Sequence, residues 1–88
     1  MNAQEIRTKM LNSYMSNDKE GLNSIHVDLL NQRAKLNRWF TRFLDLYDEK
    51  LAKADRDDPH KRLYETKFAQ YSELNTLVRA AEHYLTRT

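Results

Sequence analysis

The fold is decided by residues 22–54, which read LNSIHVDLLNQRAKLNRWFTRFLDLYDEKLAKA. At 100° per residue, most of the large apolar residues of this stretch fall on one side of a helix, within an arc of roughly 80°. These residues are Leu22, Ile25, Leu29, Leu36, Phe40, Phe43, Tyr47, Leu51 and Ala54. Their spacing is close to the repeat of about 3.5 residues that lets helices pack along a shared seam. The stretch therefore predicts a long helix, over residues 18–55, with an apolar face for neighbouring helices.

A shorter helix is predicted upstream, over residues 2–15. Ala3, Ile6, Met10 and Tyr14 recur at steps of three and four and form one narrow apolar stripe. Polar residues 16–18 then interrupt the pattern, and Asn17 followed by Glu20 has the spacing of a capping box for the long helix. The alternative start of that helix is residue 23 or 24, which would leave residues 16–23 as a short loop.

A third helix is predicted over residues 59–86, after a turn at residues 55–58. Asp58 and Pro59 fit an N-cap and a first helical position, because proline has no backbone N–H to lose there. The main apolar stripe of this helix consists of Tyr64, Phe68, Tyr71, Leu74, Val78, Ala81 and Leu85. The short turn forces the third helix to pack antiparallel to the long one, and folding there pairs Phe43 with Tyr71.

Composition supports an all-α fold in a single domain spanning residues 1–88. The 88 residues include one glycine and one proline, and 40% are hydrophobic, which favours long helices over many turns. We expect a long central helix in an antiparallel hairpin with a shorter N-terminal helix. This arrangement is either a three-helix bundle or a coiled-coil-like hairpin, and two hairpins could pair into a four-helix bundle.

The apolar surface of the two longer helices exceeds what one partner helix can cover. Trp39 and Leu46 flank the seam on one helix, and a second flank beside the stripe of the other includes Leu63, Leu77 and Tyr84. Exposed apolar patches mark association sites, and large aromatic residues are favoured anchors there. The predicted protein interface consists of Leu46, Leu63, Leu77, Ala81 and Tyr84. The alternative is that the N-terminal helix covers this flank.

A basic and aromatic patch lies on the outer face of the long helix. Lys35, Arg38 and Arg42 fall within about 60° of one another, and Trp39 stands at their apolar border. Cations contact phosphates and an aromatic ring can stack on an unpaired base, so these four residues are the candidate nucleic-acid site. The competing interpretation is an ordinary solvated helix face, because Asp45 and Glu49 continue the same strip with the opposite charge.

Catalytic and metal chemistry find little support in the sequence. There is no cysteine, and the three histidines lie on separate segments without a carboxylate motif. Asp55, Asp57 and Asp58 lack the glycine and glutamate of a calcium loop, so a turn with a helix cap is the preferred interpretation. We therefore expect no enzyme activity, no cofactor, no metal site and no small-molecule substrate. No apolar run is long enough for a membrane span, and a cytoplasmic location is expected.

These observations favour a small non-enzymatic interaction protein, an adaptor, regulator or inhibitor. It would act through helix-face contacts with a protein partner or with its own copy. The alternative function is a helper that binds single-stranded DNA or RNA through the basic and aromatic patch. The formal net charge of +2 does not decide between them.

Overall fold

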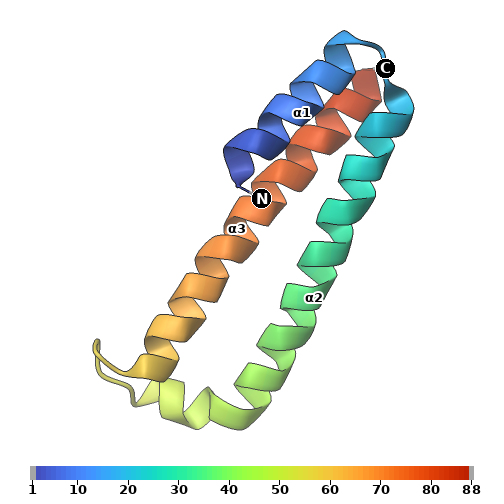
Figure 1. The fold of residues 1–88 in the computed structure, drawn as a ribbon. Helices are drawn as coiled ribbons and strands as arrows, with labels where there is room; N and C mark the ends of the chain where they lie inside the picture. The colour runs from blue at the N-terminus through green and yellow to red at the C-terminus, as the bar shows by residue number, and fades with distance from the viewer. Residues whose placement is uncertain (1, 88) are drawn as a thin grey trace.

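The computed structural model describes residues 2–87, and this part of the chain folds into three α-helices. Their bounds are Ala3–Met15 for α1, Lys19–Ala52 for α2 and Pro59–Arg87 for α3. Figure 1 shows α2 and α3 running antiparallel beside each other, with α1 lying against the C-terminal half of α3. The all-α hairpin with a shorter N-terminal helix is therefore confirmed.

The molecule is elongated because its helices differ greatly in length. It measures 50 × 20 × 18 Å, and its radius of gyration is 16.3 Å. A compact domain of this length would have a radius of gyration of about 12 Å. With 13 residues, α1 covers only part of α2, which has 34. The structure thus has a three-helix end and a two-helix end, the latter formed by residues 36–52 of α2 and 59–74 of α3 (Figure 1).

The turn between α1 and α2 differs from the predicted capping box. Asn17 has a φ of 58°, and its N–H donates to the Tyr14 carbonyl at 3.1 Å. The N–H of Asp18 donates to the Ser13 carbonyl at 2.8 Å, which completes a Schellman motif at the end of α1. Asn17 therefore ends α1, and the prediction that it caps α2 is wrong. Asp18 is the cap instead, because its carboxylate accepts the Gly21 N–H at 2.9 Å.

Gly21 gives this cap the space it needs. A Cβ atom at residue 21 would meet the Asp18 carboxylate, with 2.9 Å to its Cγ atom, and would lie 3.1 Å from the Ser13 Oγ atom. Glycine at this position leaves the Asp18 side chain free to reach the helix terminus. Its conformational cost in the first turn of α2 is therefore offset by a well-placed cap.

The turn between α2 and α3 is longer than predicted at its start. α2 ends at Ala52 and not at residue 55, and residues 53–58 connect it to α3. Within this connection, the Ala54 N–H donates to the Leu51 carbonyl at 3.2 Å and the Asp58 N–H to the Asp55 carbonyl at 3.1 Å. α3 begins at Pro59 as predicted, and the Asp58 carboxylate accepts the His60 N–H at 2.8 Å.

The aliphatic core lies at the three-helix end, where all three helices contribute. Ile6 and Met10 are the buried residues of α1, and Met10 is completely enclosed. The remaining members of this cluster come from α2 and α3: Leu22, Leu29, Leu77, Val78 and Ala81. α1 is too short to be stable as an isolated helix, so these contacts are what hold it in place.

The two-helix end is packed mainly with aromatic rings. Phe43 is 6% exposed and is the buried residue of this end within the described chain. Its ring centroid lies 6.2 Å from that of Tyr64, while Phe40 lies 5.8 Å from Tyr71. The predicted pairing placed Phe43 beside Tyr71, so α3 is shifted along α2 relative to the prediction. The longer connection and earlier end of α2 account for this shift.

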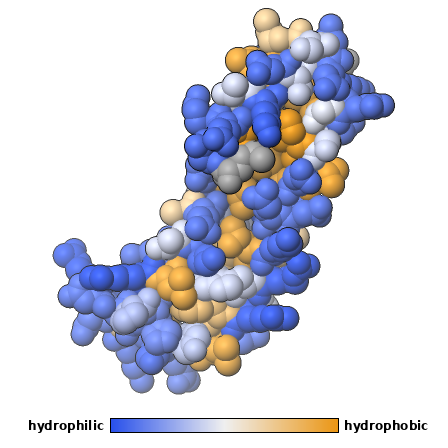
Figure 2. Space-filling model, in the orientation of Figure 1, coloured by the Kyte–Doolittle hydropathy of each residue, from blue (hydrophilic) through white to orange (hydrophobic). Residues whose placement is uncertain are grey.

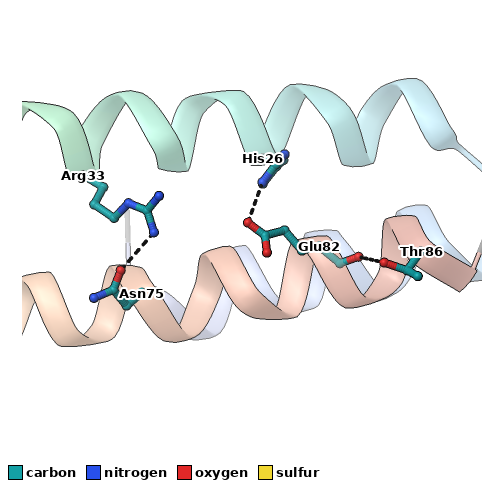
Figure 3. A network of polar contacts seen from close by, with 5 residues as sticks. All are labelled: His26, Arg33, Asn75, Glu82 and Thr86. Atoms are coloured by element: carbon teal, nitrogen blue, oxygen red, sulfur yellow. Dashed lines mark hydrogen bonds and ion pairs between the residues drawn. The ribbon is translucent and has the colours of Figure 1, made fainter.

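Polar contacts fix the alignment of α2 and α3 at the three-helix end (Figure 3). The Arg33 guanidinium donates to the Asn75 Oδ1 atom at 3.0 Å, in a half-buried position. Closer to the chain termini, the His26 Nε2 atom lies 3.4 Å from the Glu82 carboxylate. The Thr86 hydroxyl donates to the Glu82 backbone carbonyl at 2.6 Å. The first two contacts bridge α2 and α3, where aliphatic packing alone would permit sliding, whereas the Thr86 contact lies within α3.

Candidate interaction surface

The predicted interface residues are divided between the two ends of the molecule. Leu77 is 2% exposed and Ala81 is fully buried, both in the core beneath α1. Tyr84 is half-buried, and its ring centroid lies 4.9 Å from that of Tyr14 on α1. At the two-helix end, by contrast, Leu46 is 75% exposed and Leu63 is 44% exposed. The N-terminal helix therefore covers the Leu77–Tyr84 flank and leaves Leu46 and Leu63 at the surface.

The groove that holds α1 continues past its N-terminal end. A hollow of about 450 Å³ lies there, lined by Ala3 and Ile6 of α1 and by both longer helices. The lining residues of α2 are Gln32, Lys35 and Leu36, and those of α3 are Gln70, Glu73, Leu74 and Leu77. Figure 2 shows orange and pale side chains continuing beyond α1 between blue margins. This hollow is a step in the surface, at the boundary where α1 begins and the three-helix end meets the two-helix end.

Beyond this step, one flank of the hairpin lies in line with α1. At 100° per residue, Trp39 and Leu46 lie within roughly 40° of Gln32, which borders the hollow. Leu63 lies within roughly 40° of Leu77 on α3, and the Lys67 ammonium lies 5.6 Å from the Trp39 ring centroid. We call Trp39, Leu46, Leu63 and Lys67 the α1-side flank. It is where a third helix would continue if α1 were longer.

The opposite flank of the two-helix end is also partly apolar. Phe68 is 53% exposed and Leu44 is 36% exposed. The spacing of Phe68 predicts that it lies in the main apolar stripe of its helix. At the two-helix end, however, no third helix of the described chain covers the hairpin. The shifted alignment of α3 also leaves Phe68 half outside the seam. The exposed ring could have been found only with the correct alignment.

Trp39 is held by contacts within its own chain. Its ring stacks on Phe43, with 4.7 Å between centroids and 18° between planes, and meets the edge of Phe40 at 5.2 Å. The Lys67 ammonium is a cation–π partner for the same ring. A nucleobase would have to displace Lys67 or use the remaining edge, because Phe43 already occupies one face. Lys67 is a functional candidate that sequence analysis missed, since it comes from the other helix.

The cations of the predicted nucleic-acid site form an exposed strip on α2. Lys35, Arg38 and Arg42 are all exposed, whereas Trp39 is half-buried beside them. The strip continues into the exposed carboxylates of Asp45 and Glu49. Its charge therefore changes sign once, between Arg42 and Asp45, near the middle of the two-helix end.

Asp58 and His60 make local contacts at the turn before α3. The pKa of Asp58 is lowered mainly because its carboxylate accepts a backbone hydrogen bond from His60, with further backbone and side-chain hydrogen bonds adding to this. The His60 Nδ1 atom lies 3.3 Å from the same carboxylate, and the His60 ring packs 4.6 Å from Tyr47. Over residues 2–87, no group of three or more histidine and carboxylate side chains is arranged to hold a metal ion.

Two further findings bear on the surface of the chain. Within the described residues, each helix is too short or too polar to cross a membrane. Comparison of the chain with protein-family models, with curated proteins and with solved structures finds no match.

Proposed function

We propose that this chain is a non-enzymatic helical interaction protein, in the class of adaptors, regulators and inhibitors, acting in the cytoplasm. It binds a protein partner or a second copy of itself through the two-helix end. The observation that carries this proposal is the uncovered α1-side flank, on which Leu46 is 75% and Leu63 is 44% exposed. Exposed apolar side chains that gather on one face favour association.

The difference between the two ends of the molecule supports this proposal. α1 buries the apolar groove between α2 and α3 at one end and stops at Ala3, so the same groove remains open at the other. A helix from a partner would take the position that α1 takes at the three-helix end. Because the hydrophobic contribution grows with the apolar area removed from water, covering Leu46, Leu63 and the Trp39 border supplies affinity.

Site-specific crosslinking in the native host tests the proposal. A photoreactive phenylalanine analogue replaces Leu46 in one variant and Val27 in the other. Val27 is a matched control because it lies on the same helix and is 53% exposed, but at the three-helix end. We expect a discrete crosslinked product from residue 46 and none from residue 27. Absence of a product from residue 46, or equal products from both positions, would overturn the proposal.

A second candidate function is binding of single-stranded nucleic acid, in which a base would meet the remaining edge of the Trp39 ring and Lys67 would contact a phosphate. This side chain adds a fourth cation to Lys35, Arg38 and Arg42 and places it over Trp39. Four phosphate contacts would give a slope of roughly −3 for the logarithm of the binding constant against the logarithm of salt concentration. Titration of Trp39 fluorescence with an oligonucleotide measures this slope. Unchanged emission at low salt would eliminate this candidate.

A further inference from the structure

The exposed strip of α2 has an order of charges that can complement itself. Lys35, Arg38 and Arg42 precede Asp45 and Glu49, and all five side chains are exposed. At 100° per residue they fall within an arc of roughly 80°, bordered by Trp39 and Leu46 of the α1-side flank. A strip that is basic in its first half and acidic in its second matches a second copy of itself only when the two run in opposite directions.

We propose, building on the function above, that the occupant of the α1-side flank is a second copy of this chain. The copies dock antiparallel about a twofold axis that crosses α2 between Arg42 and Asp45. This arrangement places Arg42 opposite Asp45 of the second copy and Arg38 opposite Glu49 of the second copy. By symmetry each contact occurs twice, as in any isologous interface. A parallel arrangement would instead bring like charges together.

The dimensions of the molecule fit this arrangement. Residues 36–52 of α2 span about 25 Å at 1.5 Å per residue, which is half of the molecule's 50 Å length. With the axis between residues 42 and 45, the two-helix end of one copy lies along that of the other, and residue 52 falls opposite residue 35 of the second copy. The tip of this end reaches the hollow at the N-terminal end of α1 in the second copy. Each groove is then filled along its whole length, by α1 at one end and by the second copy at the other.

In this interface the apolar residues supply affinity and the charged residues set orientation. Leu46, Leu63 and the exposed border of Trp39 lose contact with water and supply the affinity. The exposed charges at the margin contribute little affinity, but they set orientation and suppress the wrong arrangement. The four helices of the paired two-helix ends form a bundle, in which the helices of the second copy cover the aromatic rings around Phe43.

Charge inversion in two complementary variants tests the inference. Arg38→Glu/Arg42→Glu makes all four paired positions of the strip acidic, with Lys35 unchanged, and Asp45→Lys/Glu49→Lys makes the strip basic throughout. All four residues are exposed, so both variants should fold, which circular dichroism checks. Analytical ultracentrifugation should show a concentration-dependent dimer for the original chain. For each variant alone, the dimer dissociation constant should rise at least about tenfold, because like charges then face each other across the interface. An equimolar mixture of the two variants should restore a dimer of one copy of each.

The outcomes separate this inference from the proposed function. An original chain that stays monomeric at millimolar concentration overturns the inference, and crosslinks from residue 46 to a different protein would then leave the proposed function standing. A dimer whose strength is unchanged in both variants, or a mixture that fails to restore it, overturns the antiparallel arrangement. A Leu46→Ser variant that dimerises as strongly as the original chain overturns the choice of flank. Binding of oligonucleotide by a strictly monomeric chain also overturns the inference.

Discussion

Docking of α1 depends on Met10 more than on any other side chain of that helix. Met10 is completely buried, and the other buried residue of α1 is Ile6, at 7% exposure. Truncation of a buried methionine to alanine typically costs about 2–5 kcal/mol, through lost burial and the cavity left behind. Because Met10 sits where all three helices meet, we expect Met10→Ala to lower the free energy of unfolding by about 3 kcal/mol. A domain of this length has roughly 4–13 kcal/mol in total, so the loss is large.

Urea unfolding followed by circular dichroism measures this effect, at a protein concentration low enough to keep the chain monomeric. Leu11→Ala is the matched control, since Leu11 adjoins Met10 on the same helix but is 47% exposed. We expect the control to cost under about 1 kcal/mol. Equal losses in both variants, or a Met10→Ala variant within about 0.5 kcal/mol of the original chain, would refute the assignment of Met10 as the anchor of α1.

Three further predictions concern the helix termini. The Asp58 pKa lies below its ordinary value of 3.8, mainly because the carboxylate accepts a hydrogen bond from the His60 N–H. The charged form of Asp58 therefore stabilises the fold above pH 3.8, and this stabilisation is lost as the pH falls through the lowered pKa. Asp58→Ala should therefore show a smaller loss of melting temperature than the original chain on acidification below pH 3.8; equal losses would contradict this. Asn17→Ala should cost about 1 kcal/mol because φ is positive there, whereas Asn17→Gly should be neutral or stabilising; equal stabilities measured in urea would exclude the strain. Gly21→Ala should lower the thermal midpoint, despite the better helix propensity of alanine, because its Cβ atom displaces the Asp18 cap; a raised midpoint would count against this reasoning.

Most of the fold could be predicted because helical periodicity is a local property of the chain. The apolar steps around Leu22–Ala54 and the Asp58–Pro59 boundary required no knowledge of tertiary contacts. The first turn was harder, because Asn17 and Asp18 are both good cap residues. Which of them caps α2 depends on which one takes the left-handed conformation that ends α1. That choice is made by the two helices together, and sequence spacing alone does not reveal it.

The candidate surface was predicted only in part, because it depends on how far each helix overlaps the next. Leu77 and Leu63 look equivalent on the helix face, yet α1 buries one and stops short of the other. Similarly, Lys67 could not be connected to Trp39 without the alignment of α3 on α2. Overlap and alignment are properties of the whole assembly, so they appear only once the three helices are placed.

The unequal lengths of the helices link the stability of the chain to the association that we propose. If α1 were extended to cover the two-helix end, the chain would bury Leu46 and Leu63 itself and gain stability as a monomer. As it stands, the aliphatic core at the three-helix end holds the hairpin together, while Leu46 and Leu63 stay exposed at the aromatic end. A ligand that binds only the folded form raises its stability with concentration. The melting temperature of the original chain should therefore rise with its own concentration, whereas that of Leu46→Ser should not. A melting temperature of the original chain that is independent of concentration would mean that the open groove is not filled by a second copy.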